Sequence, residues 1–149
     1  MTPTPYSNIF KRFEGMITDF DLDGLVVVNK EAIEIRLLND ACASFLTTTE
    51  DLSRDDTLKT FLDELSEQSE MVLANFMVQG WCKPYVNSQE LFEIHFATSE
   101  YKQFSPSEKM AQIRKLMEYA KSEASSMGVK VSVKSVMGRL CWWILIIQA

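Results

Sequence analysis

Three aspartates recur at alternate positions near the start of the chain, where their carboxylates could bind a divalent cation. Asp19, Asp21 and Asp23 are followed by Gly24, which is how a twelve-residue calcium loop begins. The twelfth position of such a loop should be a bidentate Glu, but here it is Lys30, whose charge repels calcium. A run of Val follows the glycine and favours a strand over the helix that leaves a calcium loop. The segment is therefore predicted to be an acidic, solvated turn.

The same segment resembles the nucleophile motif of the haloacid-dehalogenase phosphatases. In that family a strand delivers the first Asp, and Thr usually follows the Gly. Here the residues before Asp21 make a poor strand, Leu25 replaces the Thr, and no matching Lys and acidic pair is evident downstream. The resemblance implies a metal-dependent phosphatase that uses Asp21 and Asp23, and we keep this function as the less favoured alternative.

The histidine and the cysteines do not form a catalytic or metal-binding pattern. His95 is the single histidine, so neither a two-His metal site nor a two-His hydrolase can be built. Cys42, Cys82 and Cys141 are far apart and lack a C-x-x-C spacing, which suits reduced thiols in the cytoplasm. None of the five Gly lies in a phosphate-binding loop. We therefore predict a protein that is not an enzyme, and we expect no cofactor.

Charge is distributed unevenly along the chain, although the net charge of −6 argues against a general nucleic-acid binder. Residues 1–75 carry fifteen acids and six bases, whereas residues 101–149 carry three acids and eight bases. Either the two faces of one domain differ in sign, or the chain associates head to tail or with an oppositely charged partner. The predicted binding surfaces are the acidic stretches at residues 19–23 and 50–56 and the basic helix predicted from Ser105. The candidate binding residues are Asp19, Asp21, Asp23, Lys109, Arg114, Lys115, Lys121 and Trp142.

The first part of the chain predicts a loose start, one helix and a segment that fits two structures. Residues 1–7 are polar and contain two Pro, and residues 8–17 then place apolar side chains at helical spacing. From Leu25 to Leu37, two apolar stretches flank a polar break, which favours a β-hairpin. The competing interpretation is a helix from Asn29 to Leu46, because apolar residues also recur every four positions there.

The middle of the chain predicts helices separated by one strand. Residues 57–80 carry a helical apolar stripe, which a polar gap could divide into two helices. Residues 91–96 alternate apolar and polar side chains, as a half-buried strand does. At Ser105 an N-cap Ser is followed by Pro at the first helical position and by Glu three residues after the cap. A helix is therefore predicted from Ser105 to Met127, and Gly128 is predicted to end it.

The last residues of the chain predict a second hairpin. Val alternates with polar residues from Val129 to Val133, residues 137–139 offer a turn, and residues 140–147 contain no polar side chain. A run this short is typical of a strand covered on both faces and is too short to span a bilayer as a helix. Trp142 and the Trp after it would point to opposite faces, so Trp142 is a candidate pocket wall or interface anchor.

The segment from Asp23 to Leu46 resembles the opening of PAS domains. That family has a Gly-led strand, a second strand and an Asn that begins a short helix, which here correspond to residues 24–28, 33–37 and 39–46. The resemblance covers residues 8–65 and implies a sensor that holds a small ligand between sheet and helices. The second half departs from the family, because a helix separates its predicted strands, and the resemblance supplies no catalytic residue.

These elements predict one α+β domain over residues 1–149. In it, helices pack on a central antiparallel sheet, and the C-terminal strand is the central one. We expect a non-enzymatic regulatory domain in the cytoplasm that acts through contacts with a protein partner or with itself. A PAS-like ligand sensor is the first alternative. Nucleic acid and membrane are not expected as partners, because the chain is acidic and shows neither a signal peptide nor a membrane span.

Overall fold

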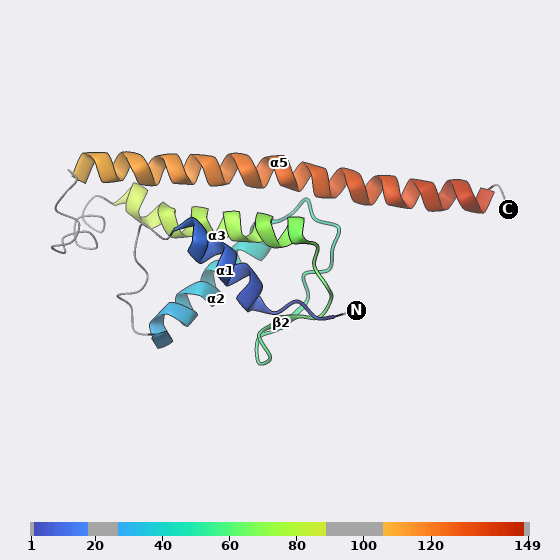
Figure 1. The fold of residues 1–149 in the computed structure, drawn as a ribbon, viewed down its shortest axis with the longest axis horizontal. Helices are drawn as coiled ribbons and strands as arrows, with labels where there is room; N and C mark the ends of the chain where they lie inside the picture. Colours follow the sequence, from blue (N-terminus) through green and yellow to red (C-terminus); the bar gives the residue numbers. More distant parts are fainter. Residues whose placement is uncertain (1, 18–26, 89–105, 148–149) are drawn as a thin grey trace.

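The computed structural model describes residues 2–17, 27–88 and 106–147, which are mostly helical (Figure 1). Its elements are α1 (Tyr6–Met16), α2 (Val27–Ser44), β1 (Arg54–Asp55), β2 (Thr60–Phe61), α3 (Glu67–Asn87) and α5 (Pro106–Ile147). β1 and β2 pair antiparallel and are the only named strands in the described ranges. The predicted α+β fold with a central antiparallel sheet is therefore wrong. The predicted strand at residues 91–96 lies outside the described residues.

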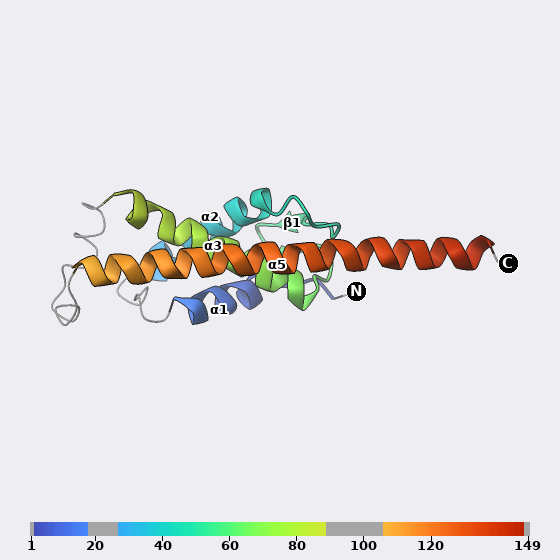
Figure 2. The ribbon, with the colours of Figure 1, turned by 90° about the horizontal axis from the view of Figure 1, so that it is seen from above.

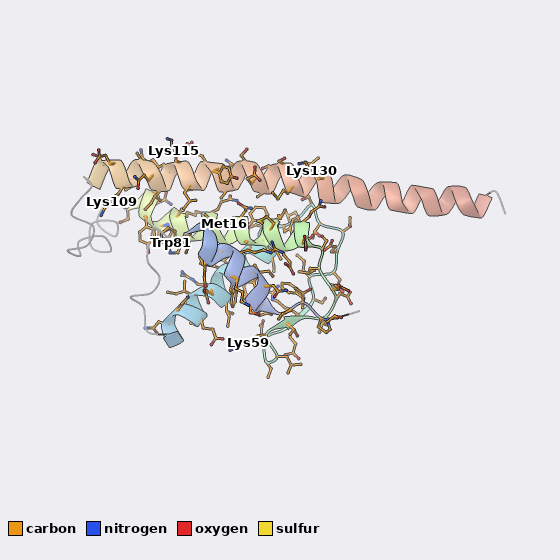
Figure 3. All side chains as sticks on the ribbon, in the orientation of Figure 1. Met16, Lys59, Trp81, Lys109, Lys115 and Lys130 are labelled. Atoms are coloured by element: carbon orange, nitrogen blue, oxygen red, sulfur yellow. The ribbon has the colours of Figure 1, made fainter. Side chains whose placement is uncertain are left out.

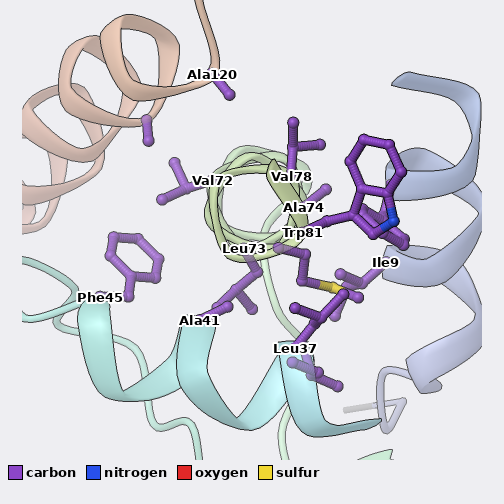
Figure 4. Close-up of a cluster of buried hydrophobic side chains, with 14 of the residues drawn as sticks. Ile9, Leu37, Ala41, Phe45, Val72, Leu73, Ala74, Val78, Trp81 and Ala120 are labelled. Carbon is purple, nitrogen blue, oxygen red and sulfur yellow. The ribbon is translucent and has the colours of Figure 1, made fainter. Parts of the chain in front are cut away.

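α3 is the central helix of this fold. It packs against α1, α2 and α5, and two perpendicular views show α5 running along it (Figures 1 and 2). Figure 4 looks nearly along α3, with buried side chains between it and the surrounding helices. The buried positions cover most of its circumference, as expected for a helix with neighbours on several sides. These positions are Ser69, Glu70, Val72, Leu73, Ala74, Asn75, Met77, Val78, Trp81 and Cys82.

The segment that precedes α1 is held against the hairpin and is not loose as expected. The carbonyl oxygen of Thr4 accepts a hydrogen bond from the N–H of Phe61 at 2.8 Å, and its hydroxyl accepts one from the N–H of Leu65 at 2.8 Å. Tyr6, the first residue of α1, packs its ring edge-on against Phe61 and donates its hydroxyl to Asp56 at 2.7 Å. These contacts fix the entry of the chain into α1, the helix that the sequence predicted at residues 8–17.

α2 occupies the segment for which a hairpin was preferred. The hairpin prediction is wrong, and the competing prediction of a helix is confirmed. The helix runs from Val27 to Ser44 rather than from Asn29 to Leu46. Leu37 and Ala41, together with Phe45 just after the helix, are buried four residues apart. A spacing of four places them on one side of a helix, so all three reach the core, whereas a strand would alternate them between two faces. The strands on which the PAS resemblance depended are thus replaced by a helix from Val27 onward.

The first part of the helix predicted at residues 57–80 is instead a turn, strand β2 and a loop. The Asp55 carboxylate accepts hydrogen bonds from the N–H groups two and three residues on, at 2.8 and 3.0 Å. The carboxylate therefore caps a tight hairpin turn rather than a helix. α3 begins after Ser66, whose hydroxyl accepts the N–H of Ser69 at 3.2 Å, and it continues through the predicted end at Gly80.

α5 is a single helix of 42 residues. It begins at Pro106 as predicted, but Gly128 does not end it, and no glycine of the described chain has a positive φ. A Cβ on Gly128 would lie 3.1 Å from the hydroxyl oxygen of Thr47, so the glycine allows a close approach to the loop after α2. The predicted C-terminal hairpin and central strand are therefore wrong, and Trp142 lies on a helix.

Candidate functional site

The C-terminal part of α5, residues 129–147, extends beyond the other described helices, and we call it the α5 tail (Figures 1 and 2). At about 100° per residue, Val129, Val133 and Leu140 return to one side of the helix. That side lies about 140–180° around the axis from Ala120 and Ala124, which are buried against the body. Val129 itself is 60% exposed. Val129 therefore lies on the side of α5 away from the body, and the later apolar residues Val133 and Leu140 recur at the same helical register.

The tail is basic as well as apolar. Lys130, Lys134 and Arg139 are its charged residues, and no acid follows Glu123 in the sequence. Lys130 is exposed, and Figure 3 places it near the point where α5 leaves the body. The last turns, residues 140–147, have no polar side chain. A helix with this composition suits a partner surface that is both apolar and acidic.

A surface of that kind lies at the end of the body from which the tail extends. Residues 51–67, which we call the acidic hairpin surface, contain six acids and two bases. Leu58 and Leu62 are 71% and 58% exposed within it. The hairpin strands lie at the tail end of the body in both ribbon views (Figures 1 and 2). The exposed acids of this surface are Asp51, Asp56, Asp63, Glu64 and Glu67.

A polar groove of about 780 Å³ lies among α2, α3 and α5. Arg36, Asp40 and Lys83 bring charge to its lining, and Phe76 and Met117 bring apolar surface. α2 and α3 approach closely beside it, because a Cβ on Gly80 would lie 3.0 Å from a methyl carbon of Leu37. The groove is large enough for a small molecule and offers charged groups that could orient one.

A pair of carboxyl groups joins α1 to α2. Burial, a hydrogen bond with Glu14 and the charge of Glu14 together raise the pKa of Glu34 to about 7. Burial opposes ionisation of Glu14 too, but hydrogen bonds with Lys30 and Glu34 and the charge of Lys30, 2.8 Å away, lower its pKa. One Glu34 carboxylate oxygen has no hydrogen-bond partner in the described chain. The pair can hold one proton near neutral pH, an arrangement that sequence patterns did not reveal.

The described residues offer no metal site. Within them, no group of three or more His, Cys, Asp or Glu side chains is placed to hold an ion. Asp19, Asp21 and Asp23 lie outside the described residues. α2 follows them as a helix, which removes one argument against a calcium loop. Lys30 still occupies the twelfth position and pairs with Glu14, so we do not propose calcium binding.

The predicted basic residues of α5 do not share one surface. Lys109 is buried, and its burial lowers the pKa of its ammonium group. Arg114, Lys115 and Lys121 are exposed, and Figure 3 shows Lys115 on the side of α5 away from α3. Trp142 lies in the α5 tail, and its side chain is outside what the structure describes. The helical spacing of Val129, Val133, Val136 and Leu140 was the overlooked signal for the tail.

Comparison with known proteins gives no relative. No protein-family model, no curated protein and no solved structure matches the chain. In the parts of the chain that the structure describes, no helix is both long enough and apolar enough to cross a membrane. The function of the chain is therefore inferred from the charge and the exposed apolar residues of its surfaces.

Proposed function

We propose that this chain is a non-enzymatic regulatory protein that acts by binding another protein chain through the α5 tail. The observation that carries the proposal is the extension of α5 beyond the body with a sequence rich in Val, Ile, Leu and Trp. Burying apolar surface is worth roughly 25 cal/mol per Å². Because an apolar helix that extends from a body gains this energy only from a partner, large apolar patches commonly mark interaction sites.

The cysteines support a cytoplasmic location and argue against thiol chemistry. Cys42 and Cys82 are free thiols, and Cys82 is fully buried. Burial raises the pKa of Cys82 to about 12, so its thiol stays protonated and unreactive at neutral pH. Free, buried thiols are typical of reducing compartments.

The proposal is tested by comparing the full chain with a chain that ends at Lys130. Both are immobilised and exposed to extract from the source cells, and the retained proteins are identified by mass spectrometry. We expect the full chain to retain a partner, or further copies of itself, and the shortened chain to retain neither. Equal retention by both chains would contradict a role for the tail, and no retention by either would remove the proposed function.

The groove among α2, α3 and α5 supports a second candidate function, the binding of a small ligand as in a sensor domain. Arg36 and Lys83 suit an anionic group on such a ligand. Native mass spectra and visible absorption of the freshly purified protein test this function. An added stoichiometric mass that disappears in Lys83→Met would support it. A clean mass in the wild type would contradict it.

A further inference from the structure

We infer that the α5 tail binds a second copy of this chain, and that two copies form a two-fold dimer in which each tail docks on the partner's acidic hairpin surface. The inference rests on the proposed function, since it names the partner of the same tail. Three observations lead to it: the charges of the two surfaces, their exposed apolar residues, and their places in the fold.

The two surfaces carry opposite charge. The tail has Lys130, Lys134 and Arg139 with no acid, whereas residues 51–67 have six acids and two bases. Both bases are engaged with acids: Arg54 lies 3.8 Å from Asp56, and Lys59 pairs with Glu31. The other exposed acids of the surface are thus available to a basic helix. Such a field steers association, and added salt weakens it because the screening length is about 8 Å at physiological ionic strength.

The two surfaces also match in apolar content. Leu58 and Leu62 are exposed on the acidic hairpin surface, although large apolar side chains are usually buried. Val129 is exposed where the apolar side of the tail begins. Contact between the two surfaces would cover these residues and leave the charged residues around them. An apolar centre with a polar rim is the usual composition of a protein interface.

The placement of the two surfaces allows a closed dimer. The tail and the acidic hairpin surface lie at the same end of the molecule (Figures 1 and 2). A two-fold rotation that sets two tails antiparallel carries each tail toward the partner's hairpin, so the same contact forms twice and the assembly closes. The tail is roughly 28 Å long at 1.5 Å per residue, enough to cross one face of a small domain. A parallel pair of tails would instead place three bases beside their own copies, which repel one another.

Charge reversal and re-pairing test the dimer directly. The tail variant is K130E/K134E/R139E, and the hairpin variant is D63K/E64K/E67K. We expect the wild type to be a dimer by native mass spectrometry and light scattering, with a dissociation constant that rises at least tenfold between 50 and 500 mM NaCl. Each variant alone should be monomeric. An equimolar mixture of the two variants should form a heterodimer, since opposite charges then meet at both contacts.

A matched triple reversal elsewhere on α5 is the control. R114E/K115E/K121E changes charge by the same amount at exposed positions outside both the tail and the acidic hairpin surface. Its dimer should persist, although the sequence made these residues candidates for binding. Thermal melts establish that each variant is folded. If a variant fails to fold, carbodiimide cross-linking of mixed isotope-labelled wild-type chains replaces it, with cross-links expected between chains from Lys130 or Lys134 to Asp63 or Glu64.

The outcomes separate this inference from the proposed function. A monomeric wild type at high protein concentration and low salt would overturn the dimer. A dimer that survives hairpin reversal would overturn the docking site and indicate direct pairing of tails. Retention of a different protein by the full chain, together with a monomeric wild type, would leave the proposed function standing and remove only the second copy as its partner.

Discussion

At the scale of single residues, Glu34 links the stability of the fold to pH. Its pKa is raised to about 7 in the folded chain, chiefly by burial. The folded state therefore holds this proton more tightly than the unfolded chain, and the stabilisation is complete below pH of about 4.5 and lost as pH rises through about 7. Glu14, whose pKa is lowered, acts in the opposite sense, because its contribution is lost as pH falls.

Glu34→Gln is expected to remove the loss of stability between pH 5 and pH 8, because an amide does not ionise. At pH 8 the variant should be more stable than the wild type by on the order of 1 kcal/mol. Urea unfolding at both pH values measures the difference. Glu118→Gln, at an exposed position on α5, is the control and should leave the pH profile unchanged. A Glu34→Gln profile parallel to that of the wild type would show that Glu34 titrates normally.

Arg12 and Glu70 form an ion pair that joins α1 to the central helix. The guanidinium of Arg12 approaches one Glu70 oxygen at 2.9 and 3.0 Å, and Asn8 donates to the other at 3.3 Å. Glu70 is buried, so Arg12→Ala would leave a carboxylate without its counter-charge, at an expected cost of about 2–3 kcal/mol in the free energy of unfolding. Arg36→Ala, at an exposed position, should change it by less than about 0.5 kcal/mol. Equal effects in urea titrations would refute the role of the pair.

At the scale of elements, the start of α3 depends on one hydroxyl. Ser66 accepts the N–H of Ser69 at 3.2 Å and satisfies one of the free donors in the first turn. Ser66→Ala should therefore lower the free energy of unfolding by about 1 kcal/mol. Ser125→Ala is the comparison and should not lower the free energy of unfolding. Ser125 lies within exposed turns of α5, where Ala is the better helix former. A Ser66→Ala protein as stable as the wild type would show that the cap is not needed.

The sequence predicted the helices with distinct caps or stripes but not those rich in β-branched residues. The Ser-Pro-Ser-Glu start of α5 and the apolar spacing of α1 correspond to observed helices. The Val-rich segments before Leu37 and after Gly128 fit both the two-residue period of a strand and the 3.6-residue period of a helix. A short alternating run can also contain apolar positions spaced by three and four. Packing against α3 favours a helix over a strand in α2, because Leu37 and Ala41 both reach the core only if the segment is helical. Local pattern alone cannot supply that tertiary contact.

The candidate site was only partly foreseeable for a related reason. The uneven charge of the two ends was evident from composition, and it led to the idea of a partner or of self-association. The acidic stretch at residues 50–56 was evident too, and it overlaps the acidic hairpin surface. The basic surface was not evident, because it depends on how far α5 continues. Lys109 was grouped with exposed bases yet is buried. Leu58 was assigned to a helical stripe yet is exposed in a hairpin turn.

At the scale of the whole molecule, the body and the α5 tail are expected to be separable. Among the α5 residues whose side chains the structure describes, Ala124 is the last buried apolar one, and Val129 is already 60% exposed. If residues 140–147 formed the central strand that the sequence predicted, they would be required for folding. The helical tail instead extends beyond the core (Figure 1). Removing it is therefore expected to leave the packing among α1, α2, α3 and the first part of α5 intact.

A chain that ends at Lys130 should melt cooperatively, within a few degrees of the full chain's melting temperature when both are monomeric. If the dimer exists, the full chain gains stability with protein concentration, because association stabilises the folded state by mass action. The shortened chain should show a melting temperature that does not depend on concentration. Calorimetry at several concentrations and at low and high salt measures both. Loss of the cooperative transition on shortening would mean that the tail belongs to the core, and that it is not a docking element.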